Sequence, residues 1–166
     1  VVEATTGQHL PPENLSVIGW ALPIALETRV ANRKQNKEPA LRWAHARHFS
    51  EAIQDALRKH LIDLLHSQDQ IGVVSVRSPG FKSFDFNGVR TSNWSERHAL
   101  YAAGLGTFGL ADTLITPKGM AMRCGTLITD LAIQPNTRTA THHMANCLFY
   151  NGGSCRRCIE RCPAGA

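Results

Sequence analysis

Three cysteines near the end of the chain have the spacing of metal ligands. Cys155, Cys158 and Cys162 follow the pattern C-x₂-C-x₃-C, and Pro163 comes directly after the last of them. This is three quarters of the bacterial ferredoxin pattern C-x₂-C-x₂-C-x₃-C-P, whose short spacers let the thiolates of one loop reach the same iron–sulfur cluster. The spacing therefore predicts ligation of a 4Fe-4S cluster, although Gly152 stands where the first cysteine of that pattern would be.

Two arrangements would complete the ligand set. Cys147 precedes Cys155 in the run ANCLFYNGGSC and could supply the missing thiolate, giving one irregular cluster bound through Cys147, Cys155, Cys158 and Cys162. In the other arrangement the chain is part of a longer two-cluster protein, cut at both ends. The cysteine before the proline then ligates the second cluster, together with residues beyond position 166.

Zinc is the main alternative metal. A C-x₂-C pair is also half of a zinc knuckle, and His142, His143 and Cys147 could complete a tetrahedral site around it. A zinc knuckle does not require the proline that follows Cys162. The pattern as a whole therefore favours iron–sulfur chemistry.

Two other groups of ligand-type residues have structural interpretations. Cys124 lies in an apolar run and is interpreted as a small buried side chain. His45, His48 and Glu51 would share one face of a helix, and such a trio can bind a metal. It is more often a solvated surface, so we expect no metal there.

Hydrophobic periodicity predicts the elements that must position these residues. Residues 16–24 and 71–76 are short apolar runs typical of buried strands. Between them, apolar side chains recur at three- and four-residue spacing and predict an amphipathic helix over about 48–66. The residues of its apolar face are Phe49, Ala52, Ile53, Ala56, Leu57, Leu61, Leu64 and Leu65.

The second half of the chain predicts a shorter helix and two strands. Asn93 and Glu96 form a capping-box-like start for a helix over 94–103, and Gly104 supplies a left-handed stop. Two strands, at 110–116 and 120–133, are expected to form a hairpin with its turn at 117–119. After Pro135 the composition becomes polar, as in a linker. We therefore expect an α/β (α+β) domain over residues 1–140 and a cysteine segment over 141–166.

The glycines of this region satisfy G-x-G-x-x-G at Gly104, Gly106 and Gly109. A dinucleotide site needs a strand before these glycines and a helix after them, so that the pyrophosphate meets the helix N-terminus. Here the predicted order is reversed. The glycines are better explained by a helix stop and a tight turn that allows close approach of a neighbouring strand or of a bulky cofactor.

Composition sets limits on the kind of protein. The chain has 166 residues, of which 43% are hydrophobic, enough for a buried core. Its net charge of +5 is spread along the sequence, which favours anionic ligands in general more than nucleic acid. No apolar stretch is long enough for a membrane span, and clustered cysteines suit a reducing compartment. We therefore expect a cytoplasmic protein with no membrane partner.

Four segments together resemble the epoxyqueuosine reductases and their relatives, which include the reductive dehalogenases. The resemblance covers most of the chain and keeps the order and separation of the segments. They are SVIGWALP at 16–23, HARHFSEAIQDALRKHLIDLL at 45–65, ERHALYAAGLGTFGLADTLIT at 96–116 and CRRCIERCPAGA at 155–166.

The resemblance implies a nitroreductase-like domain that binds a cobalamin, followed by a ferredoxin-like module with 4Fe-4S clusters. Electrons from an external donor would pass through the clusters to the cobalt, and the substrate would be a small molecule or a tRNA. It also implies that the glycine turn and the preceding helix border the corrin. The candidate cofactor contacts are then Arg97, Gly106, Thr107 and Phe108.

The sequence departs from the family at the proton donor. The resemblance implies an acidic residue shortly before Glu96 and Arg97, but Arg90, Thr91 and Ser92 stand there. Two alternatives to a corrinoid enzyme therefore stay open. One is a flavin-dependent nitroreductase-like enzyme, and the other is a non-catalytic iron–sulfur electron carrier.

Overall fold

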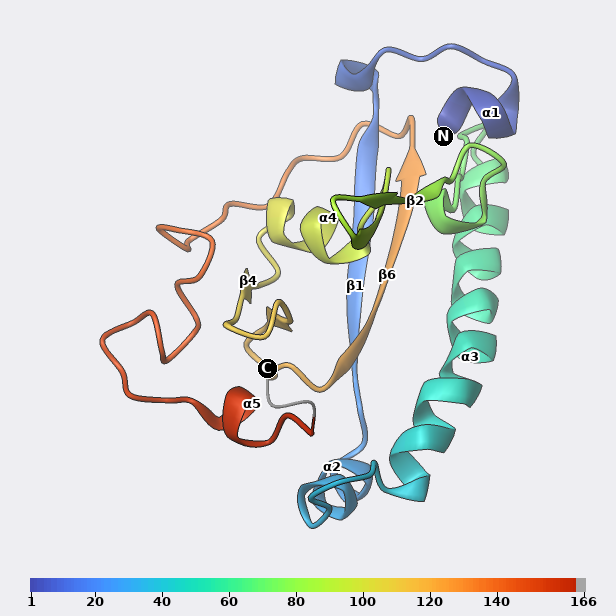
Figure 1. Cartoon of the computed structure of the whole chain (residues 1–166). Helices are drawn as coiled ribbons and strands as arrows, with labels where there is room; N and C mark the ends of the chain where they lie inside the picture. The colour runs from blue at the N-terminus through green and yellow to red at the C-terminus, as the bar shows by residue number, and fades with distance from the viewer. Residues whose placement is uncertain (164–166) are drawn as a thin grey trace.

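A long antiparallel ribbon of two strands forms the centre of the molecule. In the computed structural model, which describes residues 1–163, β1 (Ser16–Pro23) pairs with β6 (Met122–Thr129) along its whole length. The ribbon joins strands from opposite ends of the chain, and the other elements lie around it (Figure 1). Both strands were predicted, and both are confirmed with somewhat shorter bounds.

Helix α3 (Leu41–His66) is the longest element and runs along one edge of the ribbon (Figure 1). The predicted helix over 48–66 is confirmed, but it begins earlier, because the segment after Pro39 is rich in good helix formers. The shorter helices are α1 (Val2–Thr6), α2 (Leu26–Arg33), α4 (Glu96–Ala102) and α5 (Arg157–Glu160), with 3-10 turns η1 (Pro12–Asn14) and η2 (Ser75–Arg77).

The side of α3 that faces the ribbon is polar. Gln54 is fully buried there, where it accepts a hydrogen bond from Trp20 Nε1 (2.6 Å) and donates one to the carbonyl of Cys124 (3.0 Å). Arg58 is also buried, at 4% exposure. Of the predicted apolar face only Leu65 is buried, so most of that face points outward.

The small strands differ from prediction. An Asn87-Gly88 turn with positive φ at both residues joins β2 (Ser83–Phe86) to β3 (Val89–Ser92), a hairpin that was not predicted. The predicted strand at 71–76 is wrong, because Val73 alone bridges to Ile128 before the chain turns into η2.

The predicted hairpin after residue 110 is also wrong. Its turn is present, with Gly119 at a φ of +93°. However, β5 (Leu114–Ile115) pairs with β4 (Thr107–Phe108), whereas β6 pairs with β1. The two strands that flank the turn therefore belong to different sheets.

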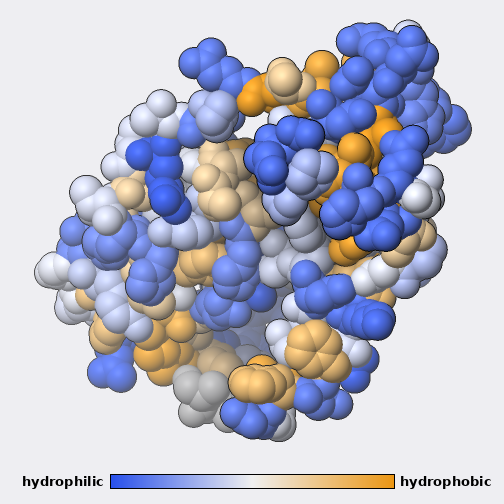
Figure 2. Space-filling model, turned by 90° about the horizontal axis from the view of Figure 1, so that it is seen from above, coloured by the Kyte–Doolittle hydropathy of each residue, from blue (hydrophilic) through white to orange (hydrophobic). Residues whose placement is uncertain are grey.

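Two small clusters of buried apolar side chains form much of the core of residues 1–163. One joins Val2, Val73 and Ile128, and the other packs Leu100 of α4 between Phe108 and Leu114. Seen from above, the surface is largely hydrophilic with separate apolar groups (Figure 2). The chain is thus a mixed α+β structure with small antiparallel sheets, which agrees with the coarse prediction of the fold class.

Among the described residues, no helix combines the length and apolar composition that a membrane span would need.

Candidate metal and cofactor site

Cys147 is the one buried residue of the segment 142–163, at 7% exposure. Burial alone would raise the pKa of its thiol. Hydrogen bonds to its sulfur from the backbone amides of Phe149, Leu110 and Tyr150 outweigh that effect and lower the pKa. Because the thiolate is the form that binds metals, this cradle of amides favours Cys147 as a ligand.

The residues before Cys147 fasten the cysteine segment to the domain. The backbone amide of Asn146 donates to Thr107 Oγ1 (2.8 Å), and its side-chain amide donates to the carbonyl of Ile115 (3.0 Å). The amide of Phe108 donates to the carbonyl of His143 (2.7 Å). The strands β4 and β5 therefore form the platform on which Cys147 is held.

Thr107→Val should loosen this attachment. Thr107 is fully buried, so the substitution leaves the amide of Asn146 without its acceptor, and we expect the free energy of unfolding to fall by about 1–3 kcal/mol. Thr113→Val is the matched control, because the buried Thr113 Oγ1 makes no hydrogen bond within residues 1–163. Urea denaturation of both variants measures the difference. Equal stability of the two variants would contradict this role of Thr107.

The other three cysteines lie on and around α5. Cys158 is within the helix, and Cys155 and Cys162 flank it, all of them half-buried. Cys155 lines an open hollow of about 670 Å³ between α5 and the loop after Cys147. At the far side, Arg161 donates to the carbonyl oxygens of Asn32 (3.3 Å), in the last turn of α2, and of Gln35 (2.7 Å), just after it. Within residues 1–163, no three His, Cys, Asp or Glu side chains form a metal-binding group.

The glycine motif is a structural turn, as its reversed order predicts. Helix α4 precedes it, Gly104 has a φ of +78°, and β4 follows. A Cβ on Gly106 would lie 2.6 Å from the carbonyl oxygen of Ile115. The close approach that glycine permits is therefore to the neighbouring strand β5.

Three of the four predicted cofactor contacts are packed inside the protein. Gly106 and Thr107 are buried, and Phe108 is 7% exposed and contacts the rings of His98 and Tyr101 in tilted arrangements. Arg97, by contrast, is on the surface, at 42% side-chain exposure, and is hydrogen-bonded to Asp112. Arg97 is thus the one of the four that is open to a ligand.

The chain matches no protein-family model, and neither the curated proteins nor the solved structures include a match to it.

Two hollows meet at the start of α4. One, of about 620 Å³, lies under the β2–β3 hairpin, and the other, of about 350 Å³, lies over β6; Ser95 and Arg97 line both. Ser95 is also the N-cap of α4 and accepts a hydrogen bond from the amide of His98 (3.4 Å). The predicted cap at Asn93 is wrong, because its side chain instead bonds to the backbone of Lys82 and Gly80.

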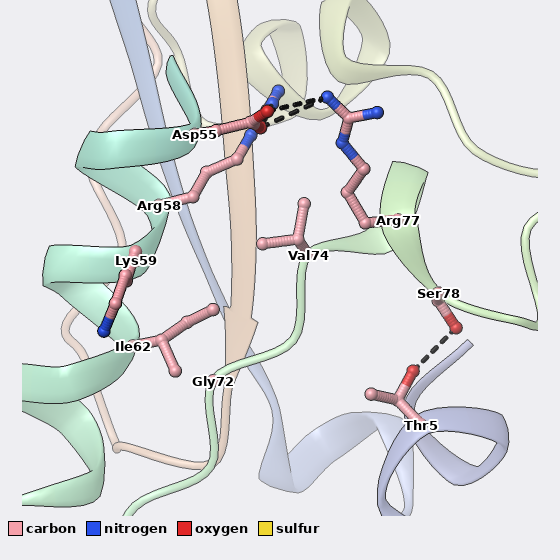
Figure 3. Close-up of a pocket in the computed structure, with 9 residues that line it drawn as sticks. All are labelled: Thr5, Asp55, Arg58, Lys59, Ile62, Gly72, Val74, Arg77 and Ser78. Atoms are coloured by element: carbon pink, nitrogen blue, oxygen red, sulfur yellow. Dashed lines mark hydrogen bonds and ion pairs between the residues drawn. The ribbon is translucent and has the colours of Figure 1, made fainter. Parts of the chain in front are cut away.

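Glu96 does not take part in helix capping. Its Oε1 accepts hydrogen bonds from Arg58 Nη2 and from the amide of Thr126, both at 3.2 Å. Arg58 also pairs with Asp55 (2.8 Å), and Arg77 reaches Asp55 from η2 (3.0 Å). Figure 3 shows the ion pair between Arg77 and Asp55. Both residues line a hollow of about 400 Å³. The charged groups under α3 thus form one connected network.

This network should make stability depend on pH in two opposite ways. Hydrogen bonds from Arg58 and then Arg77 hold the pKa of Asp55 below its ordinary 3.8, so its contribution is lost as the pH falls below 3.8. Burial raises the pKa of Glu96 above its ordinary 4.5, so the free energy of unfolding falls as the pH rises from 4.5 through the raised pKa.

Urea denaturation between about pH 3 and pH 7 tests both directions of the pH dependence of stability. Glu96→Gln should become more stable relative to the wild type as the pH rises above 4.5. Asp55→Asn should lose its deficit relative to the wild type as the pH falls below 3.8. Stability curves that run parallel to the wild type would contradict both assignments.

The remaining candidate ligands are not brought together. His45 and His48 are exposed and their rings contact Phe49, whereas Glu51 pairs with Arg123 (3.1 Å). Cys124 is half-buried, with its sulfur 3.5 Å from the sulfur of Met122. Burial, and then the charge of Glu96, raise the pKa of its thiol, which disfavours the thiolate.

Sequence reasoning missed the network of Arg58, Glu96 and Asp55. The available signal was the charge of Arg58 in the middle of a long helix, at a position one turn from Asp55. Nothing in the local pattern indicates that Glu96, on another element, would meet it.

Proposed function

We propose that the protein is an iron–sulfur redox protein that holds a 4Fe-4S cluster through Cys147, Cys155, Cys158 and Cys162. The observation that carries this proposal is the buried Cys147 thiol, whose sulfur accepts three backbone amide hydrogen bonds. This thiol lies in the same segment as a C-x₂-C-x₃-C-P pattern. Hydrogen bonds to cysteine sulfur are one of the means by which proteins set the potential of such clusters.

The donor set fits a cluster. Four thiols within sixteen positions supply the soft ligands that iron–sulfur clusters require, and the amide cradle favours the ionised form of Cys147. Metal binding and folding are coupled in small metal-binding segments. Ligation is therefore expected to draw the thiols of the α5 region toward Cys147, and the bound cluster would supply one-electron transfer.

The chain's own residues have three roles in this proposal. The bonds from Asn146 to Thr107 and Ile115 hold the ligand segment on the domain. Arg161 fixes the other end of the segment at α2. Arg157, at 84% side-chain exposure and 3.9 Å from Glu160, offers positive charge to an acidic electron-donor protein near the cluster.

A second cofactor at Arg97 is the finer part of the proposal. Arg97 lines both hollows at the start of α4, beside the hydroxyl of Ser95. A guanidinium and a hydroxyl at the junction of two hollows suit the phosphate of a corrinoid or a flavin. The nitroreductase-like domain, the cobalamin and the small-molecule or tRNA substrate belong to this part and rest on the resemblance. The cytoplasmic location is also proposed, and it rests on the composition and the clustered cysteines.

Anaerobic reconstitution tests the cluster and distinguishes a cofactor-binding enzyme from an electron carrier. Protein treated with iron and sulfide should gain a visible absorption band that bleaches on chemical reduction and returns on oxidation. Hydroxocobalamin or FMN is then added to the reconstituted protein and to Arg97→Ala. Binding that Arg97→Ala weakens supports a cofactor enzyme, and cluster redox activity with no cofactor binding supports an electron carrier. Absence of the band after reconstitution would contradict the iron–sulfur proposal.

A further inference from the structure

The outward face of α3 carries six apolar side chains, of which four are contiguous at the middle of the helix. Phe49, Ala52, Ile53 and Ala56 recur at three- and four-residue spacing on the side opposite Gln54 and Arg58, which face the ribbon. Leu41 and Leu64 lie about two turns away at either end, beyond His45 and His60. In Figure 1 no other element covers the outer side of α3. The large side chains of this face are Leu41, Phe49, Ile53 and Leu64, at 71%, 61%, 62% and 48% exposure, and Ala52 and Ala56 lie exposed between them.

We propose that this face, defined by those six residues, is the interface of a symmetric dimer in which α3 packs antiparallel against α3 of a second copy. Folded monomers rarely leave large contiguous apolar patches in water. Two-fold dimers are the commonest protein assemblies, and their interface must be self-complementary. The order of side chains along α3 meets this condition.

One antiparallel register of the two helices matches facing side chains both in size and in charge. With Ala52 of each copy opposite Ile53 of the other, the large Phe49 faces the small Ala56, His45 faces His60, and Leu41 faces Leu64 at the two ends. In the central four residues, each pair combines a large and a small side chain, which is the pattern that close helix packing needs.

The same register places Arg42 opposite Asp63 of the second copy. Within residues 1–163, Arg42 makes no ion pair, and Asp63 pairs with Lys59 of the next turn (2.7 Å). The second copy would therefore add two ion pairs, each between Arg42 of one copy and Asp63 of the other, near the two ends of the interface. The exposed carboxylates of Asp55 and Asp63 offset much of the charge of the exposed Arg42, Arg47 and Lys59. The helix therefore presents mixed charges, which favour a second copy over an anionic lipid surface.

Light scattering coupled to size exclusion tests the dimer on the full chain. The protein is examined under reducing conditions, so that thiols do not cross-link, at a chain concentration on the order of 50 µM, where a micromolar dimer is populated. Phe49→Glu should raise the dissociation constant about 30-fold or more, because it buries an unpaired charge at the centre of the interface. Phe86→Glu, at an equally exposed phenylalanine of the β2–β3 hairpin (64%), should leave the dimer unchanged.

A charge exchange tests the register. Arg42→Asp and Asp63→Arg should each weaken the dimer about tenfold, since each replaces two attractive pairs by two repulsive ones. The double variant should recover most of the affinity. A chain that stays monomeric, a dimer that Phe49→Glu leaves intact, or a double variant as weak as the singles would overturn the proposal.

Discussion

Cys147→Ser is expected to abolish assembly of a complete cluster. The wild type should bind about four irons and four sulfides per chain, and the variant should retain less than about a tenth of that iron. The physical reason is that serine removes the buried thiol whose sulfur accepts the three backbone amides. Iron and acid-labile sulfide are measured after anaerobic reconstitution, with circular dichroism to show that the domain remains folded.

Cys124→Ser is the matched control for this result. Cys124 lies on β6, and burial raises the pKa of its thiol, which disfavours the thiolate that a cluster needs. Its replacement should leave the iron content at the wild-type value. Full cluster content in Cys147→Ser, or equal loss in both variants, would exclude Cys147 as the specific fourth ligand.

Arg58→Ala is expected to cause the largest loss of stability, about 3–5 kcal/mol in the free energy of unfolding. Arg58 is 4% exposed and contacts the carboxylates of Asp55 (2.8 Å), Glu96 (3.2 Å) and Glu51 (3.6 Å). The substitution leaves Glu96, at 20% side-chain exposure, without its cation between α3 and the ribbon. Urea denaturation at neutral pH measures the loss.

Arg77→Ala provides the comparison for that loss. Arg77 pairs with the same Asp55 (3.0 Å), but its side chain is 56% exposed, so its removal should cost only about 0–1 kcal/mol. Similar losses in the two variants would show that burial of Arg58 does not govern the strength of the network.

The elements with strong periodic patterns could be predicted from the sequence. β1, β6 and α3 all lie where the apolar patterns indicate. The segment 71–76 has the same apolar character, but only Val73 reaches the ribbon, because strand pairing depends on distant residues such as Ile128. The β2–β3 hairpin was missed even though Asn87-Gly88 is a strong turn signal, since its short strands are mostly exposed and carry a weak alternating pattern.

The orientation of α3 shows why periodicity alone is insufficient. Its apolar residues predict an amphipathic helix, and the helix forms. The side of the helix that packs against the ribbon is nevertheless determined by polar interactions. These are the hydrogen bonds of Gln54 with Trp20 and Cys124 and the ion pairs of Arg58. These interactions link residues far apart in sequence, so no local pattern contains them.

The candidate site was predictable in its residue types and less so in its arrangement. The cysteine spacing singled out the ligand segment, but the amide cradle of Cys147 depends on Leu110 from another part of the chain. Thr107 and Phe108 were expected at a cofactor, and the structure places them in the platform under the ligand segment. Their burial follows from the tertiary position of β4, which sequence alone does not give.

The most direct test of the central claim is the metal and sulfide content of the anaerobically purified protein, read together with its visible spectrum. The account predicts about four irons and four acid-labile sulfides per chain, with a band that bleaches on reduction. One zinc per chain, or neither iron nor sulfide after reconstitution, would contradict the assignment of Cys147, Cys155, Cys158 and Cys162 as cluster ligands.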